Sequence, residues 1–455
     1  MVERPTTARD RQLERVHRPS LREHVGAVSP RLDESNTRSG ILSASMMKSA
    51  RLLPLLGLIF AAWSAGARAE DWPQFRGLGG QGHSTEKNLP FEWGEGRNVA
   101  WRTPVPGRGW SSPVVAGGRV WLTTAVDNSG GVSMQVLAFD AATGEEVVHV
   151  EAFLVGGLYL RNTKNSHASP TPIVEGDRVF VHFGADGTSA FSTEGEFLWE
   201  TRLGYESQHG AGGSPTLYRD LLIVNCDGHD QAYVVALDKA TGEVRWKTMR
   251  REPYDQAYST PLVIRVGDRD QLISVGAHWT YAYDPLTGKE LWRVNYGDGF
   301  SNVPRPVFSM GLVFIATGFD TPKILAVRPT GSGDVTRTHV AYTIDRGAPH
   351  TPSPIAVGDE LYMVSDIGVA TCLDAATGKI LWQHRLGGNF SASPVFADGR
   401  IYFQNEDGVT TVIAPGKEFR QLARNTLDGM TFASIAVSQG SLFIRTDAYL
   451  YRIGK

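Results

Sequence analysis

Apolar residues beyond position 70 come in short runs separated by turn-forming residues. Two such runs are Leu222 to Cys226 and Ala370 to Asp374. No long apolar stripe at helical spacing appears after residue 70. Short runs bounded by Gly, Pro, Asn or Asp are typical of strands rather than of helices. The chain also holds 50 Gly and 24 Pro among its 455 residues, which suits many strands joined by tight turns. The pattern therefore predicts an all-β protein.

A unit with Asp, Thr-Gly and Trp at fixed spacing recurs along the chain. Four close copies, the first without its Trp, and a fifth that is one residue shorter before its Gly are Ala138–Gly144, Ala236–Trp246, Ala282–Trp292, Cys372–Trp382 and Ala190–Trp199. The Asp accepts backbone hydrogen bonds in a turn and the Gly tolerates a positive φ, so the unit predicts a β-hairpin. A large flat side chain once per repeat suits the wedge between neighbouring sheets. We therefore expect four tryptophans to be structural docking residues: Trp199, Trp246, Trp292 and Trp382.

A second repeated element, usually Ser or Thr followed by Pro and a strand, lies upstream in each unit. The Pro column is occupied in turn by Pro113, Pro172, Pro215, Pro261, Pro306, Pro354, Pro394 and Ile435. Successive members are 59, 43, 46, 45, 48, 40 and 41 residues apart, and a period near 45 is typical of a propeller or a solenoid. Eight such elements predict an eight-bladed β-propeller with four antiparallel strands in each blade.

The eighth blade lacks residues for a fourth strand, because few remain after Arg452. Residues 98–105 have the pattern of that missing strand. We expect this N-terminal strand to complete the last blade, which would remove the free sheet edges of an open array. The propeller then occupies residues 98–455 and follows a lead-in segment at residues 70–97.

The repeat resembles that of the pyrroloquinoline quinone-type propeller family, which includes quinoprotein alcohol dehydrogenases and the outer-membrane assembly scaffold BamB. The resemblance rests on the unit Ala-x-Asp-x-x-Thr-Gly-x-x-x-Trp and extends from about Asp71 to the end of the chain. Asp71-Trp-Pro-Gln-Phe-Arg-Gly77 also resembles the opening segment of secreted bacterial members. The resemblance implies the fold, whereas function differs among proteins that share it.

Residues 46–69 have the pattern of a signal peptide. A basic stretch at Lys48–Arg51 precedes an apolar run from Leu52 to Trp63, and Ala67-Arg68-Ala69 supplies the small residues of a cleavage site. The apolar run is shorter than a membrane-spanning helix requires. We expect cleavage after Ala69 and a periplasmic or secreted protein without a transmembrane segment. Residues 1–45 are either a disordered extension or the product of a misassigned start upstream of Met46.

Charge and cysteine content exclude two classes of site. Residues 70–455 carry 34 Lys and Arg against 42 Asp and Glu, without a basic stripe, which argues against nucleic acid as a partner. Cys226 and Cys372 lie 146 residues apart in different repeats, so they form neither a disulfide framework nor a Cys-x-x-Cys metal or haem site. We expect both to be buried as small apolar residues.

A quinone enzyme resembling this fold would be expected to have two adjoining cysteines and a set of acidic and amide ligands for Ca²⁺. No cysteines adjoin here, and no acidic cluster stands out in the loops that enter the blades. No haem motif and no catalytic triad with a convincing spacing occurs either. We therefore expect no cofactor, with pyrroloquinoline quinone and calcium as the alternative.

Any ligand site of a propeller lies where the loops before the innermost strands converge on the centre. The residues before the Pro column are Ser112, Thr171, Ser214, Thr260, Arg305, Ser353, Ser393 and Ser434. Only Arg305 departs from the small hydroxyls, and it either faces the centre, where it suits a carboxylate or phosphate, or pairs with an acid such as Asp298. Further residues of this mouth are Arg108, Trp110, His167, His209, Tyr258, Asn302, His350, Asn389 and Phe390.

The three histidines of the mouth belong to blades two, three and six, which does not favour a shared metal site. The insertion at about residues 151–165 is either a loop that binds a partner or a cover for the first two blades.

We interpret the chain as an exported, monomeric binding or assembly scaffold that engages a protein or a cell-envelope component through its loops. The alternatives are a periplasmic quinone-dependent oxidoreductase and a sensor or carbohydrate-associated module.

Overall fold

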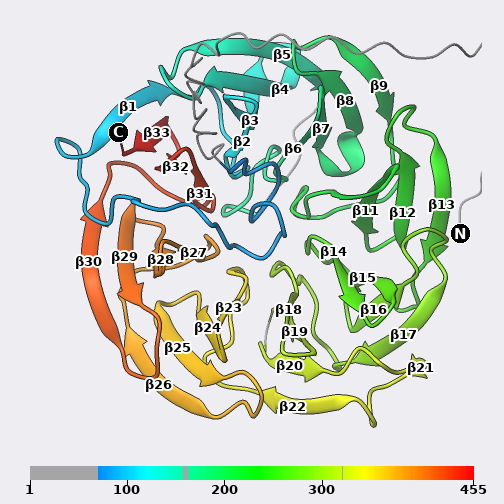
Figure 1. Ribbon diagram of the computed structural model, residues 1–455. Helices are drawn as coiled ribbons and strands as arrows, with labels where there is room; N and C mark the ends of the chain where they lie inside the picture. The colour runs from blue at the N-terminus through cyan, green and yellow to red at the C-terminus, as the bar shows by residue number, and fades with distance from the viewer. Residues whose placement is uncertain (1–69, 157–161, 320, 455) are drawn as a thin grey trace, which may run out of the picture. The chain divides into compact units, whose positions relative to one another are not determined.

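Eight sheets surround a common centre in the computed structural model, which describes residues 70–156, 162–319 and 321–454 (Figure 1). Every sheet has four antiparallel strands, and one carries a short fifth strand in parallel. The predicted eight-bladed propeller is confirmed. The predicted extension and signal peptide, residues 1–69, lie outside the described residues. Within the described ranges no helix is long and apolar enough to cross a membrane.

The first four blades follow one another along the chain, and in the first three the innermost strand is the shortest. Their strands, from the inside outward, are β2 (Val114–Ala116), β3 (Arg119–Asn128), β4 (Gly131–Asp140) and β5 (Glu146–Val155); β6 (Ile173–Glu175), β7 (Arg178–His182), β8 (Thr188–Ser192) and β9 (Phe197–Thr201); β10 (Thr216–Tyr218), β11 (Leu221–Asp227), β12 (Ala232–Asp238) and β13 (Val244–Met249); β14 (Leu262–Val266), β15 (Arg269–Val275), β16 (Trp279–Tyr283) and β17 (Glu290–Asn295), with β21 (Gly333–Asp334) beside β17.

The last four blades repeat this order, and the eighth takes its outermost strand from the start of the propeller. Their strands are β18 (Val307–Ser309), β19 (Leu312–Ala316), β20 (Ile324–Val327) and β22 (Val340–Ile344); β23 (Ile355–Val357), β24 (Glu360–Val364), β25 (Val369–Asp374) and β26 (Ile380–Arg385); β27 (Val395–Ala397), β28 (Arg400–Gln404), β29 (Val409–Ala414) and β30 (Arg420–Thr426); β31 (Ala436–Ser438), β32 (Ser441–Arg445), β33 (Tyr449–Ile453) and β1 (Val99–Pro104).

The ring closes as the sequence predicts. Strand β1 pairs antiparallel with β33, from Val99 opposite Ile453 to Pro104 opposite Tyr449 (Figure 1). The first strand of the propeller thus joins the last blade, and both long edges of that blade's final hairpin are paired.

An indole N–H links neighbouring blades at four seams. Trp199 Nε1 on β9 donates to the Lys239 carbonyl in the next blade at 3.1 Å, and the same bond joins Trp101 to Ala141, Trp246 to Pro285 and Trp382 to Gly416. At Gly242 the φ is +77°, and a Cβ there would lie 2.5 Å from the Trp199 ring. The Thr-Gly turn therefore supplies a flat surface on which the indole of the preceding blade packs.

Trp292 corrects the expectation that all four repeat tryptophans dock alike. Its Nε1 donates to Gln271 Oε1 within its own blade, at 2.8 Å. The next blade offers no Asp-x-x-Thr-Gly turn at this seam, because residues 328–339 instead leave their blade and pair with β17 through β21. At the following seam Tyr342 takes the place of the tryptophan and donates to the Ala375 carbonyl.

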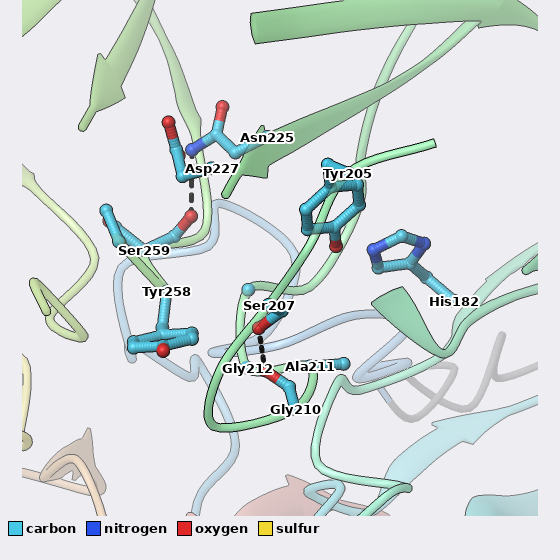
Figure 2. Close-up of a pocket in the computed structure, with 12 residues that line it drawn as sticks. His182, Tyr205, Ser207, Gly210, Ala211, Gly212, Asn225, Asp227, Tyr258 and Ser259 are labelled. Carbon is cyan, nitrogen blue, oxygen red and sulfur yellow. Dashed lines mark hydrogen bonds between the residues drawn. The ribbon is translucent and has the colours of Figure 1, made fainter. Parts of the chain in front are cut away.

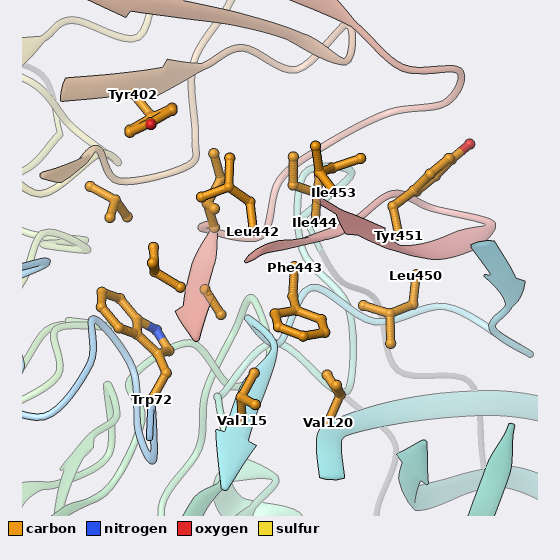
Figure 3. Close-up of a cluster of buried hydrophobic side chains, with 14 of the residues drawn as sticks. Trp72, Val115, Val120, Tyr402, Leu442, Phe443, Ile444, Leu450, Tyr451 and Ile453 are labelled. Carbon is orange, nitrogen blue, oxygen red and sulfur yellow. The ribbon is translucent and has the colours of Figure 1, made fainter. Parts of the chain in front are cut away.

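The apolar core consists of clusters that lie between neighbouring blades. Figure 3 shows the cluster around the closing seam, where Phe443 of β32 faces Val115 and Val120 of the first blade, and Leu442 lies on the opposite side, towards Tyr402. Trp72 of the lead-in segment joins this cluster and is fully buried. The lead-in segment is thus part of the core.

Candidate functional site

The hydroxyl residues that precede the innermost strands form a hydrogen-bonded ring. Each accepts a bond from the backbone N–H of the corresponding residue one blade earlier, at 2.9–3.0 Å. The seven acceptors are Thr171, Ser214, Thr260, Ser353, Ser393, Ser434 and Ser112. These hydroxyls hold the blades together, which gives the repeated Ser or Thr a structural reason.

Arg305 stands where the eighth hydroxyl would be and extends towards blades three and four and the lead-in segment. Its guanidinium donates to the Pro261 carbonyl at 2.9 Å, to Thr216 Oγ1 at 3.3 Å and to the Phe75 carbonyl at 2.9 Å. The suggested pairing with Asp298 is wrong, because all these acceptors are neutral and Asp298 is exposed. Burial lowers the pKa of Arg305 to about 9.

The lead-in segment crosses the centre of the ring (Figure 1), and its Phe75 carbonyl accepts the bond from Arg305. Trp72 pairs with Val115 of the first blade, Gln81 Oε1 accepts a bond from the Phe308 N–H, and Gly82 accepts one from the Phe396 N–H. Arg76 is 1% exposed and donates to the carbonyls of Gln81 and Pro354. The segment therefore bonds to the innermost strands on several sides of the ring.

The described end of the insertion between the first two blades covers the other side of the centre. Lys164 forms an ion pair with Glu406 of the seventh blade at 2.9 Å, and Asn165 Nδ2 donates to the carbonyls of His209 and Ala211. Arg108 Nη2 donates to the Thr163 carbonyl at 2.7 Å. Residues 162–165 thus connect loops of blades seven and three across the predicted mouth.

The predicted mouth residues make separate contacts in place of one shared site. Trp110 is buried against Phe432, with ring centroids 4.5 Å apart, and Arg108 lies over its indole. Asn302 Nδ2 donates to the Gly276 carbonyl and to Tyr296. Asn389 is exposed, and its carbonyl accepts a bond from the Glu406 N–H.

The three histidines of the mouth are also apart. His167 is buried with its Nδ1 4.0 Å from Asp186, whereas His209 lies beside the Tyr258 ring and His350 beside Phe319. Over the described ranges no three His, Cys, Asp or Glu side chains are grouped so as to hold a metal ion. The structure therefore does not bring these histidines into one chemical centre.

Tyr258 and the loops of blades two to four surround a small polar cavity (Figure 2). Its volume is about 10 Å³, enough for roughly one water molecule. Burial lowers the pKa of His182 on this wall to about 3, so that imidazole is neutral at pH 7. Burial also raises the pKa of Tyr258. The cavity is too small for a cofactor.

A buried ion pair includes Asp227, which also lines this cavity. Asp227 Oδ1 is 2.5 Å from Arg250 Nε, and both side chains are almost fully buried. Burial raises the pKa of Asp227 to about 6, against the opposing effect of the Arg250 charge. Ser274 accepts from Arg250 and donates to Asn225, whose Nδ2 donates to the Ser259 carbonyl. This network joins blades three and four beneath the loops.

Sequence reasoning missed this pair and the buried Arg76 and Arg445. Arg445 Nη1 donates to the Thr123 carbonyl at 2.8 Å, and burial lowers its pKa to about 9. The available signal was a charged residue at the end of an apolar strand, as in Leu221–Asp227 and Ser441–Arg445. Burial could not be inferred from that signal alone, because strand ends also point to solvent.

The described residues do not provide the features expected for calcium and pyrroloquinoline quinone. Cys226 lies in blade three and Cys372 in blade six, and both are buried free thiols. Burial raises the pKa of each thiol, that of Cys372 to about 12. The centre is lined by arginines where calcium would need carboxylates. We therefore derive no reaction step through this cofactor.

Comparisons with known proteins agree with the architecture. The family model described as outer membrane protein assembly factor BamB matches residues 154–271 and 276–417, together more than half of the chain. Similar proteins include a tetrathionate hydrolase from Acidithiobacillus ferrooxidans, 24% identical over 343 residues, and BamB from Yersinia pestis, 25% identical over 253 residues. These alignments cover 68% and 52% of this chain, and 65% and 61% of the relatives, which is less than two thirds of each.

Solved structures show the same fold at low identity. BamB from Moraxella catarrhalis matches with a TM-score of 0.55 and 13% identity, over 78% of this chain and 99% of that one. A europium-containing methanol dehydrogenase matches with a TM-score of 0.51 and 12% identity, over 84% of this chain and 90% of that one. The structures support the propeller, and the family assignment rests on the sequence model. The chain belongs to the family described as outer membrane protein assembly factor BamB.

Proposed function

We propose that this protein is a non-enzymatic scaffold of the bacterial cell envelope that engages a protein of outer-membrane assembly. The proposal combines the family match with the predicted export signal and the mildly acidic propeller. It places the contact on the loop face, defined as the end of the blades that carries residues 162–165, Phe319, Ile367 and Met430. The BamB relatives are named as outer membrane protein assembly factors, which supports this class of partner by analogy.

The observation that carries the proposal is the way the centre of the ring is filled. Residues 162–165 cross it on the loop face, and Arg305 with the lead-in segment fills it beneath. A ligand of cofactor size would have to displace these bonds. By contrast, three large apolar side chains of the loop face are exposed, namely Phe319, Ile367 and Met430. These side chains offer apolar contact area on the loop face to a protein partner.

A site-specific crosslinking experiment tests the loop face. A photoreactive amino acid at Ile367, 61% exposed, is compared with one at Val244, 53% exposed and at the opposite end of its blade. We expect Ile367 to crosslink to an outer-membrane assembly protein in whole cells and Val244 to give no such product. Equal products from both positions, or none from Ile367, would contradict the proposal.

The quinone-dependent alternative is tested on the same protein. Calorimetric titration with pyrroloquinoline quinone and Ca²⁺, beside Arg305→Ala, should show no saturable binding if the protein is a scaffold. Tight binding with quinone-dependent dye reduction would replace the scaffold by an oxidoreductase. A loss of that binding in Arg305→Ala would place the quinone at the centre of the ring.

A further inference from the structure

We propose that the seam between blades four and five binds a small solute that carries a carboxylate or phosphate group. The site is a groove of about 400 Å³, within the usual size range of ligand pockets. It lies at the end of the blades opposite the loop face, so it is independent of the function proposed above. Its walls are the start of β15, residues 289–292 of the fourth blade and residues 329–332 of the fifth.

The groove exists because the repeat fails at this seam. At three other seams a tryptophan packs on the Thr-Gly turn of the next blade, as Trp199 does on Gly242, and at a fourth seam Trp382 bonds to the Gly416 carbonyl. Here Trp292 bonds to Gln271, and Gln271 Nε2 donates to the Pro329 carbonyl at 2.9 Å. Residues 328–339 then turn away to place β21 beside β17. The outer part of the seam is therefore left open.

The groove is rich in hydrogen-bond donors. The Lys289 ammonium has no hydrogen bond or ion pair to another described residue, and Arg269 has only a weak pairing with Asp284 at 3.9 Å. Among the described residues the backbone N–H groups and hydroxyls of Thr330 and Ser332 likewise have no hydrogen-bond acceptor. All of them are available to a ligand.

The groove is poor in free acceptors. Its one carboxylate, Glu290, is held by Arg293 at 2.5 Å. Both ends of the Gln271 side-chain amide already have partners, because its Oε1 accepts a bond from Trp292 and its Nε2 donates to the Pro329 carbonyl. An ammonium, a guanidinium and turn N–H groups without a free carboxylate suit an oxyanion rather than a cation or a neutral sugar. This charge balance sets the class of ligand.

Calorimetry on the full chain tests the site with inorganic phosphate and citrate as probes and trehalose as a neutral control. We expect at least one anion to bind saturably, and the double variant Arg269→Gln with Lys289→Gln to weaken it about tenfold or more. The matched control is Lys379→Gln, at the same turn position in blade six, where Trp382 docks on blade seven and bonds to the Gly416 carbonyl. That control should bind like the parent protein.

A steric variant separates the groove from general charge effects. Thr330→Trp fills the groove without changing its charge and should also abolish binding, while the thermal unfolding midpoint shows that the variants remain folded. No saturable binding of either anion, or equal weakening by Lys379→Gln, would overturn the proposal. Binding of a hexa-aspartate peptide without binding of phosphate or citrate would replace the small solute by an acidic protein segment.

Discussion

At the scale of single residues, the seams depend on one hydrogen bond and one close packing contact. Trp199 is 6% exposed, its N–H bonds to the Lys239 carbonyl, and its ring covers Gly242. Thr201 adds a bond from its hydroxyl to the Gly242 carbonyl at 2.6 Å. The repeated Trp-x-Thr and Thr-Gly elements are thus two halves of one contact, contributed by successive blades.

We predict that Trp199→Ala lowers the free energy of unfolding by about 3 kcal/mol, because it removes a buried ring and leaves a cavity at the seam. Urea denaturation measures this change. The adjacent Leu198→Ala, at a side chain that is 40% exposed, serves as the control and should change the free energy by less than about 1 kcal/mol. Equal losses in the two variants would contradict the docking role.

The aspartates of the repeat turns predict a dependence of stability on pH. Hydrogen bonds from backbone N–H groups lower the pKa of Asp140 and Asp238, and the Thr377 hydroxyl and N–H lower that of Asp374. A carboxyl whose folded pKa lies below its unfolded value of about 3.9 stabilises the fold above that pH. This stabilisation is lost as the pH falls through the folded pKa.

We therefore expect the unfolding free energy to decrease on acidification below about pH 5, and to decrease less in a variant with Asn at all three positions. Asn still accepts the turn hydrogen bonds but carries no titrating charge. Denaturation at a series of pH values gives the comparison. If the unfolding free energy of the triple variant decreases on acidification as much as that of the parent protein, other carboxylates cause the loss of stability.

At the scale of elements, the lead-in segment and the hydroxyl ring meet at Arg305. The ring has a hydroxyl at seven positions. At the eighth position Arg305 provides no hydroxyl and instead donates to the carbonyls of Phe75 and Pro261. Burial, and to a lesser degree the Arg305 charge, lower the pKa of Arg76 to about 9. Arg305 therefore ties the segment to the ring at the cost of two cations held near each other.

We predict that Arg305→Thr completes the hydroxyl ring and removes the bonds from Arg305 to the lead-in segment and to Pro261. A hydroxyl at position 305 can accept a bond from the Thr260 N–H, so hydrogen exchange at that amide should slow. Loss of the bond to Phe75 should speed exchange at Gly80 and Gly82 of the lead-in segment. Hydrogen exchange followed by mass spectrometry or NMR measures both. Unchanged protection at Gly82 would show that Arg305 does not hold the segment.

At the scale of the whole molecule, closure of the ring determines whether a strand edge is exposed. Strand β1 covers β33, and Trp101 of β1 docks on Ala141 of the first blade. The seam between the first and last blades therefore depends on residues from both ends of the propeller, which links the stability of all eight blades.

We predict that deletion of residues 70–104 lowers the unfolding temperature and produces dimers or larger species, since β33 becomes a free edge. Size-exclusion chromatography with light scattering measures the mass. Deletion of residues 1–69 alone serves as the control and should leave a protein of the same association state as the full chain. A monodisperse, equally stable product of the longer deletion would contradict the closure argument.

The sequence by itself determined the number of blades, their four-stranded pattern and the closing strand. Each of these follows from local repeats, namely turn residues, the Pro column and the missing fourth strand near Arg452. A propeller repeats the same contact at each seam, so a periodic sequence carries most of the information that the fold needs.

Only the tertiary structure decided what lies at the centre and at the unlike seam. The partners of Arg305 come from the lead-in segment and blades three and four, and those of Lys164 from blade seven, far apart in the chain. The groove beside Trp292 likewise depends on where residues 328–339 run. These contacts arise where the repeat is broken, and a broken repeat has no second copy from which its geometry can be inferred.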